Sequence, residues 1–240
     1  MEPSLLQFSV GANDWRDLKA TIEGQARGGI YYKEEDLDGP LLLACKMGHP
    51  RCVEILLKNG ARVDPPDTVL VGGFDAKMKD PLAYCEAPLH ASITHGNVEC
   101  ATMLIKNNAD VDRMGKYNMT TPLQCACYFQ HVDIAKLLLK HGADVNLEDD
   151  ENATPLINAV CNGSPACVRL MLSARADVTV VHNGRTALQW ARYFVRSGPQ
   201  MSAAENASND HKACVKLLEP EERKERGSKR KLSVAANYYY

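Results

Sequence analysis

The side chains best able to do chemistry in this chain are its nine cysteines and seven histidines. Thiolates and imidazoles act as nucleophiles, proton carriers and zinc ligands when several of them meet in one site. No C-x-x-C pair is followed by a second pair at zinc spacing, and G-x-x-x-x-G-K, G-x-S-x-G and H-E-x-x-H are absent. We therefore expect no catalytic residues, no cofactor and no metal site, and we rank an enzymatic function last.

The cysteines instead follow a repeat. Cys52, Cys100 and Cys167 each lie twelve residues after the second residue of a recurring tetrapeptide, and Ile134 holds the same place in another copy. A position shared by Cys and Ile is apolar, and a free Cys packs as a small buried hydrophobe. We expect reduced core cysteines in a reducing compartment rather than disulfides.

The recurring tetrapeptides divide the chain into units that begin 48, 34, 33 and 32 residues apart. In the clearest unit, Thr121 is suited to cap a helix and Pro122 to take its first position, where a missing N–H costs nothing. An apolar stripe from Ile134 to Leu138 predicts a second helix, and Gly142 suits its left-handed C-terminal cap. The copies are Gly39-Pro40-Leu41-Leu42, Ala87-Pro88-Leu89-His90, Thr121-Pro122-Leu123-Gln124, Thr154-Pro155-Leu156-Ile157 and Thr186-Ala187-Leu188-Gln189.

Over residues 4–219 this pattern resembles the ankyrin repeat, because a period near 33 residues carrying T-P-L-H-x-A is typical of that family. The resemblance implies an all-α fold, an ankyrin-repeat solenoid of stacked helix–turn–helix pairs with projecting hairpin-like loops. It also implies that the concave face, formed by the loops and the first helices, binds another protein. We assign residues 1–38 to a degenerate N-terminal capping repeat and connector, 39–219 to five repeats, and 220–240 to a charged tail that is disordered or a frayed helix.

Two departures from the family pattern carry expectations. Only His90 keeps the motif histidine, so we expect no hydrogen-bond network between repeats through that position; its replacements are Leu42, Gln124, Ile157 and Gln189. Arg175 occupies the capping position of Gly60 and Gly142, where a left-handed backbone costs a non-glycine residue about 1 kcal/mol.

Two insertions interrupt the period. The first falls in 65–86, between the first two full repeats, and it includes Phe74 and a short strand-and-turn signal. The second, 195–210, splits the last repeat and is expected to be flexible. A long loop in a compact array is more often functional or disordered than idle, and we leave open whether 65–86 contacts a partner.

Candidate binding residues come from the ends of the first helices and from the loop tips. In this family, the two residues after the first-helix Ala pair face the concave groove, and aromatic and Met side chains there are favoured interface anchors. The alternative is that they pack on the neighbouring repeat. Trp190 shares a position with Leu43 and is expected to pack in the core. The helix-end candidates are Lys46, Met47, Thr94, His95, Tyr128, Phe129, Tyr193 and Phe194; the loop candidates, besides Phe74, are Tyr117, Asn118, Asp150, Glu151, His182 and Asn183.

These features favour a non-enzymatic, monomeric scaffold that binds a partner protein in the cytoplasm. A net charge of −2 gives no strong attraction to nucleic acid or anionic lipid, and no apolar run approaches the roughly 20 residues of a membrane span. The alternatives are an adaptor or inhibitor that recruits a target to another complex, or weak polyanion binding by the basic C-terminal tail. Lys229-Arg230-Lys231 in that tail is also a candidate nuclear import signal.

Overall fold

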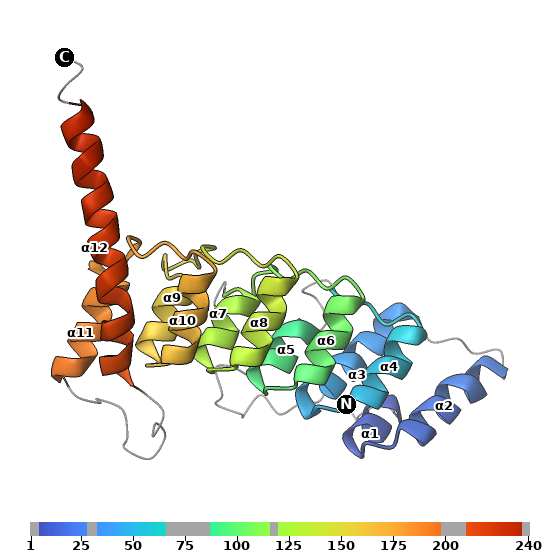
Figure 1. Ribbon diagram of the computed structural model, residues 1–240. Helices are drawn as coiled ribbons and strands as arrows, with labels where there is room; N and C mark the ends of the chain where they lie inside the picture. Colours follow the sequence, from blue (N-terminus) through green and yellow to red (C-terminus); the bar gives the residue numbers. More distant parts are fainter. Residues whose placement is uncertain (1–4, 28–32, 66–86, 116–119, 198–209, 237–240) are drawn as a thin grey trace.

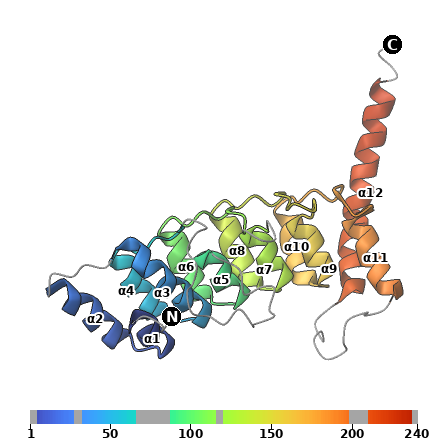
Figure 2. The same ribbon diagram turned by 180° about the vertical axis from the view of Figure 1, so that it is seen from behind.

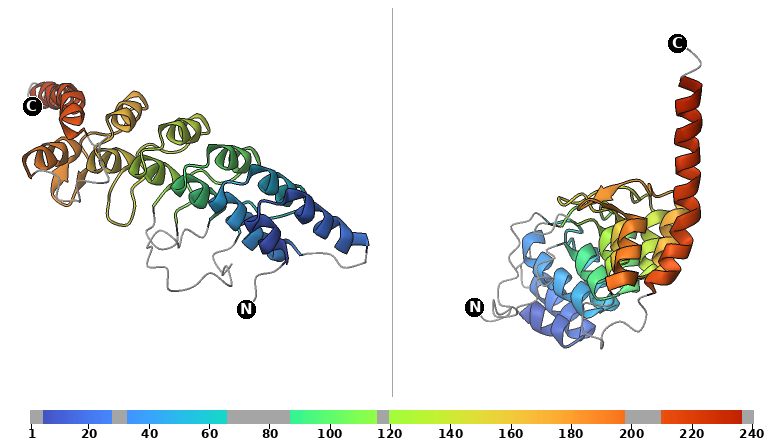
Figure 3. Two further views of the ribbon diagram at one scale, coloured as in Figure 1. Left: turned by 90° about the horizontal axis from the view of Figure 1, so that it is seen from below. Right: turned by 90° about the vertical axis from the view of Figure 1, so that its left-hand side faces the viewer.

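Helix pairs stack side by side along one axis in the computed structural model, which describes residues 5–27, 33–65, 87–115, 120–197 and 210–236 (Figure 1). The first helices of the pairs form one row and the second helices form another (Figure 3). Each helix contacts the next helix of its own row, from α1 and α2 at one end to α11 and α12 at the other. This arrangement confirms the all-α ankyrin solenoid.

The first row consists of α1 (Leu5–Gly11), α3 (Glu34–Met47), α5 (Pro88–Thr94), α7 (Pro122–Tyr128), α9 (Pro155–Cys161) and α11 (Ala187–Ser197). The second row consists of α2 (Trp15–Arg27), α4 (Pro50–Lys58), α6 (Val98–Lys106), α8 (Val132–Lys140), α10 (Pro165–Ser173) and α12 (His211–Ala236). Two short antiparallel strands, β1 (Val181–His182) and β2 (Arg185–Thr186), precede α11. Seen from behind, the loops that join successive pairs lie along one edge of the stack (Figure 2).

The recurring tetrapeptide starts the first helices for the expected reason. The Oγ1 atom of Thr121 accepts a hydrogen bond from the backbone N–H of Gln124, whose side chain in turn accepts one from the N–H of Thr121. This reciprocal capping satisfies two N–H groups that have no partner inside the helix. The first full repeat differs, because α3 begins at Glu34 and Pro40 lies inside the helix.

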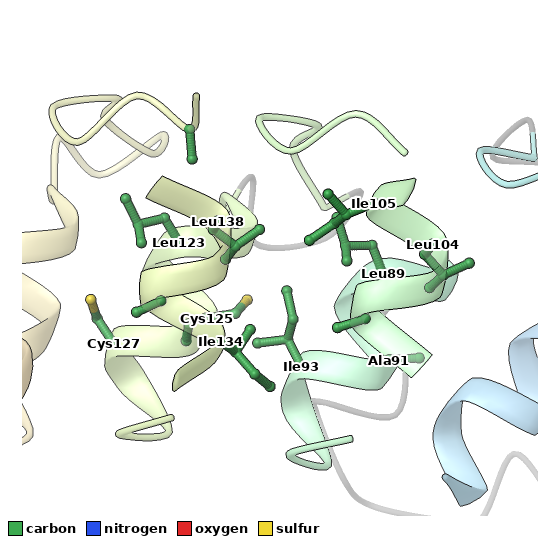
Figure 4. Close-up of a cluster of buried hydrophobic side chains, with 14 of the residues drawn as sticks. Leu89, Ala91, Ile93, Leu104, Ile105, Leu123, Cys125, Cys127, Ile134 and Leu138 are labelled. Atoms are coloured by element: carbon green, nitrogen blue, oxygen red, sulfur yellow. The ribbon is translucent and has the colours of Figure 1, made fainter. Parts of the chain in front are cut away.

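The core is continuous between repeats, as stacking requires. Ile93 of α5 and Ile134 of α8 come from adjacent repeats and approach each other between the helix pairs, with Leu89 and Leu138 above them (Figure 4). All four side chains are fully buried. Neither repeat could remove this apolar surface from water alone, which is why the array folds as a unit.

The cysteines lie where the repeat predicts. The eight in the described ranges are all free, and Cys52, Cys100 and Cys167 are buried in the core. Burial raises the pKa of Cys161 and that of Cys214 to about 12, so these two thiols stay protonated at neutral pH. A hydrogen bond with Cys127 instead lowers the pKa of Cys167 to about 7, but this side chain has no exposed surface.

Hydrogen bonds between repeats are more extensive than the motif histidine suggested. The Nε2 atom of His90 lies 3.0 Å from the carbonyl oxygen of Thr120, in the next repeat. Gln124, one repeat later, makes the equivalent bond, donating from Nε2 to the carbonyl oxygen of Ala153 at 2.6 Å. The expectation that this network would fail without histidine was therefore wrong at Gln124, because an amide N–H can replace an imidazole as donor.

The ends of the array differ from its middle. At the N-terminus, α1 and α2 bury Leu6 and Leu18 against α3 and α4, while the outer surface of α2 is mostly exposed and polar, as a capping unit requires. At the C-terminus, α12 continues through Pro220 to Ala236 and projects beyond the stack (Figure 1). Most of the segment assigned to a charged tail is therefore the second half of this helix. Of the insertions predicted at 65–86 and 195–210, residues 66–86 and 198–209 lie outside the described residues. The start of the second was placed too early, because α11 continues through Ser197.

Arg175 has the left-handed backbone expected of a C-terminal cap, with φ +65°, and Gly60 and Gly142 occupy the same place with φ +94° and +92°. Arg175→Gly should relieve about 1 kcal/mol of strain and raise the melting temperature by about 2–4 °C in differential scanning calorimetry. Gly142→Ala is the matched control, because an added Cβ there meets no atom within 4 Å. Gly142→Ala should lose about as much stability as Arg175→Gly gains. An unchanged melting temperature of Arg175→Gly would contradict the strain argument.

Candidate protein-binding surface

The C-terminal ends of the first helices leave large side chains uncovered. Met47 and Tyr128 are 52% and 47% exposed, and His95 is also exposed. The other helix-end candidates are half-buried, namely Lys46, Thr94, Phe129, Tyr193 and Phe194. All eight side chains therefore keep some solvent-exposed surface that could contact a partner.

In the central repeat, two of these aromatics touch. The rings of Tyr128 and Phe129 meet edge to face with centroids 5.1 Å apart, and Phe129 stacks on His131 at 6.1 Å. Burial lowers the pKa of His131, which favours a neutral ring at this position. Phe129 is thus partly used in packing, whereas Tyr128 presents its ring to solvent.

The largest aromatic cluster lies at the C-terminal end, on α11. Trp190 is its centre: the ring centroids of Tyr193 and Phe194 each lie 5.7 Å away, the first perpendicular at 89° and the second nearly parallel at 26°. Phe194 also packs on His211 of α12, with centroids 4.8 Å apart. The indole N–H of Trp190 donates to the carbonyl oxygen of His182 at 3.0 Å, which fixes the ring relative to the β1–β2 hairpin.

A cation completes this cluster. The guanidinium carbon of Arg185, on β2, lies 4.8 Å from the centroid of Trp190 and 4.7 Å from that of Tyr193. Both distances are within the range of cation–π attraction. Among the described residues, no carboxylate forms an ion pair with Arg185, so the two rings are its main partners there.

Loop candidates from the sequence join the same cluster. The Nδ1 atom of His182 lies 2.9 Å from the carbonyl oxygen of Glu151, and the side chains of His182 and Asn183 meet at 2.9 Å. Glu151 belongs to the run Glu148-Asp149-Asp150-Glu151, which we call the acidic loop, and both Asp150 and Glu151 are exposed. The structure thus connects Glu151, His182 and Asn183 with the aromatics of α11.

Other candidates are not part of this group. Met47, His95 and Tyr128 lie on separate repeats along the first-helix row (Figure 1). Phe74, Tyr117 and Asn118 lie outside the described residues.

Sequence reasoning missed Arg185 and the way the cluster is assembled around Trp190. Trp190 was expected to pack in the core because it shares a position with the apolar Leu43, and it does pack against the core, although it is half-buried. Asn158 of α9 holds the same position and is half-buried too, so the position is not fully covered in every repeat. For Arg185 the local sequence carried no signal.

The loops are held in place by backbone bonds between repeats. In each of three successive loops, an Asp N–H donates to the side chain of an Asp or Asn in the preceding loop. Burial, followed by the nearby charges of Asp144 and Asp110, raises the pKa of Asp112, although its bonds from Asp144 oppose the shift. The donor–acceptor pairs are Asp110 to Asp64 at 2.8 Å, Asp144 to Asp112 at 3.0 Å and Asp177 to Asn146 at 2.8 Å.

Two negative findings bear on other kinds of site. Within the described ranges, no group of three His, Cys, Asp or Glu side chains is arranged to hold a metal ion. No helix there has an apolar stretch long enough to cross a lipid bilayer.

Comparisons with known proteins agree with this architecture. A family model described as ankyrin repeats in three copies matches residues 67–149 and 143–226, and one described as an ankyrin repeat matches residues 36–68. An ankyrin repeat and KH domain-containing protein of Caenorhabditis briggsae is 30% identical over 188 residues, covering 67% of this chain and 7% of that protein. The chain therefore spans a small part of that relative's length.

Proposed function

Because the chain belongs to the ankyrin repeat family, we propose that it is a non-enzymatic scaffold that binds a partner protein through its concave face and hairpin loops. The observation that carries this proposal is the partly exposed aromatic surface on α7 and α11. We further propose that it acts as a monomer in the cytoplasm. Sedimentation at micromolar concentration should then show one species with the mass of one chain.

Rigid presentation is the proposed mechanism. The bonds between successive loops and the stacked helices fix the candidate residues before a partner arrives, so little conformational entropy is lost on binding. Large aromatic side chains have few rotatable bonds and therefore lose little conformational entropy when they are fixed in an interface. This is one reason that Trp and Tyr dominate the energetics of many interfaces.

Replacing Tyr128, Phe129, Tyr193 and Phe194 together with alanine tests the surface. We expect the variant to lose at least tenfold in partner affinity, because anchors of this kind contribute 1 kcal/mol or more each. The immobilised wild-type chain and the variant would be exposed to the same cell lysate, and retained proteins quantified by mass spectrometry.

A control on the second-helix row keeps the result interpretable. Val98, Lys106, Lys136 and Lys140 are exposed on α6 and α8, and their alanine variant should retain the same proteins as wild type. Circular dichroism would verify that both variants are folded. A partner retained equally by the aromatic variant and by wild type would show that binding uses another surface.

A further inference from the structure

The cluster on α11 combines two features that together indicate the chemistry of a partner. Trp190 and Tyr193, which we call the cation site, present perpendicular rings with a positive charge held between them. The cation site also lies beside the acidic loop, through the contact of His182 with Glu151. Neither feature is needed to stack the repeats, because the inner units have no such cation between two rings in the described chain.

We propose that the cation site receives an arginine side chain from a basic segment of the partner protein, and that Arg185 occupies the site in the free protein. This inference rests on the proposed function and adds the chemistry of the partner. On binding, the incoming guanidinium replaces that of Arg185 against the two rings.

The rings are positioned for a cation rather than for an apolar side chain alone. The indole N–H of Trp190 is already bonded to the carbonyl oxygen of His182, which leaves the π-surface as the part available for a new contact. Phe194 stacks on Trp190 and is itself packed on His211, so the indole plane cannot easily reorient. Aromatic faces carry negative charge density and attract cations, most strongly for Trp.

Local charge favours a basic segment. The loops at 141–154 and 174–186 contain six carboxylates against two basic side chains other than histidine, Arg175 and Arg185, although the whole chain carries only −2. Such a local excess of negative charge speeds encounter with a positively charged partner and opposes an acidic one. The carboxylates are Asp144, Glu148, Asp149, Asp150, Glu151 and Asp177.

Arginine suits the site better than lysine. A planar guanidinium can stack on an aromatic face and is more weakly hydrated than an ammonium, so it loses less on leaving water. The side chain that occupies the site in this chain is itself an arginine. The inference therefore predicts discrimination between two probes of equal charge.

Fluorescence anisotropy with two labelled peptides tests this discrimination on the full chain. The probes carry three arginines or three lysines, each separated by glycine and serine. We expect the arginine peptide to bind about fivefold more tightly, and Tyr193→Leu to remove most of that preference. Trp15→Leu, which alters an exposed aromatic in the N-terminal helix pair, outside the candidate surface, should leave both affinities unchanged.

Arg185→Gln separates occupancy of the site from overall charge. Because the substitution vacates the rings, the arginine peptide should bind several-fold more tightly than to wild type. Arg192→Gln is the matched control: it removes the same charge from α11, but Arg192 is exposed and pairs with Glu219 at 2.8 Å. That variant should stay within about twofold of wild type, since screening weakens an exposed charge.

Several outcomes would overturn the cation site. Equal binding of the two peptides, no binding, no effect of Tyr193→Leu in a folded protein, or equal tightening by Arg185→Gln and Arg192→Gln would each do so. The scaffold function fails separately. If the four-alanine variant loses its protein partners while the peptides ignore Tyr193, the function stands and the cation site is wrong. If the peptides respond as expected but partner capture is undiminished in that variant, the cation site stands and the proposed partner-binding surface is wrong.

Discussion

Arg62→Leu is expected to lower the free energy of unfolding by about 3 kcal/mol, because it leaves a buried carboxylate without its counter-charge. Asp38 on α3 is 0% exposed, and Arg62, in the loop after α4, reaches it with two guanidinium nitrogens. The backbone N–H of Arg62 also donates to Asp38 at 3.0 Å. The carboxylate of Asp38 therefore links α3 to the loop that follows α4 in the same repeat.

Urea unfolding measures the loss in free energy of unfolding of Arg62→Leu, and two further variants serve as controls. Arg51→Leu breaks a pair with Glu54 in the same repeat, but the Arg51 side chain is 74% exposed, so the loss should stay below about 1 kcal/mol. Adding Asp38→Asn to Arg62→Leu removes the buried charge while an amide oxygen still accepts the backbone bond. We expect the double variant to recover most of the loss. Equal stability of the single and double variants would mean that the buried charge is not the cause.

Most of the fold could be predicted from the sequence, because neighbouring residues within each repeat determine where its helices begin and end. Thr121 and Pro122 begin a helix and Gly142 ends one, as capping chemistry requires. The shared position of Cys52 and Ile134 correctly indicated a buried residue. These features depend on a few neighbouring residues, so they can be read without knowing how the repeats are stacked.

The candidate site could be predicted only in part, because its contacts join residues of different repeats. Tyr193 and Phe194 were identified by their position in the repeat, but their link to Glu151 spans two repeats. Trp190 was correctly expected to pack on the core, but its contacts with Arg185 and the β1–β2 hairpin could not be read from the repeat. Arg62 shows the same limit, since the equivalent residues Asp110 and Asp144 bond to adjacent loops instead.

The turn between the two helices of a repeat contains a volume constraint that sequence alone did not reveal. Gly48 has φ +69°, and an added Cβ would lie 2.5 Å from Oδ1 of Asn97 in the next repeat. Gly96 stands in the same relation to His131, at 2.9 Å from its ring. In both places the left-handed backbone favours glycine, and a side chain of the next repeat fills the space that a Cβ would occupy.

In the following repeat the sizes are exchanged: the large residue stands at the glycine position and the small residue faces it. Gln130 occupies the glycine position with φ +60°, and the residue facing it in sequence register is the small Ser164 rather than Asn or His. The bond between repeats is also reversed, because Gln130 donates from Nε2 to the carbonyl oxygen of Asn162 at 2.9 Å. A large residue is therefore tolerated on one side of this turn when the other side is small.

Gly48→Ala should consequently cost about 2–4 kcal/mol, well above the roughly 1 kcal/mol expected of Gly142→Ala. The methyl group strains the backbone and displaces Asn97, whose Nδ2 donates to the carbonyl oxygens of Cys45 and Lys46 at 2.7 and 3.1 Å. Combining Gly48→Ala with Asn97→Ser imitates the pair at Gln130 and Ser164. In a double-mutant cycle measured by urea unfolding, we expect the double variant to be more stable than the summed single costs by about 1 kcal/mol. Strict additivity would show that the two positions do not compete for the same space.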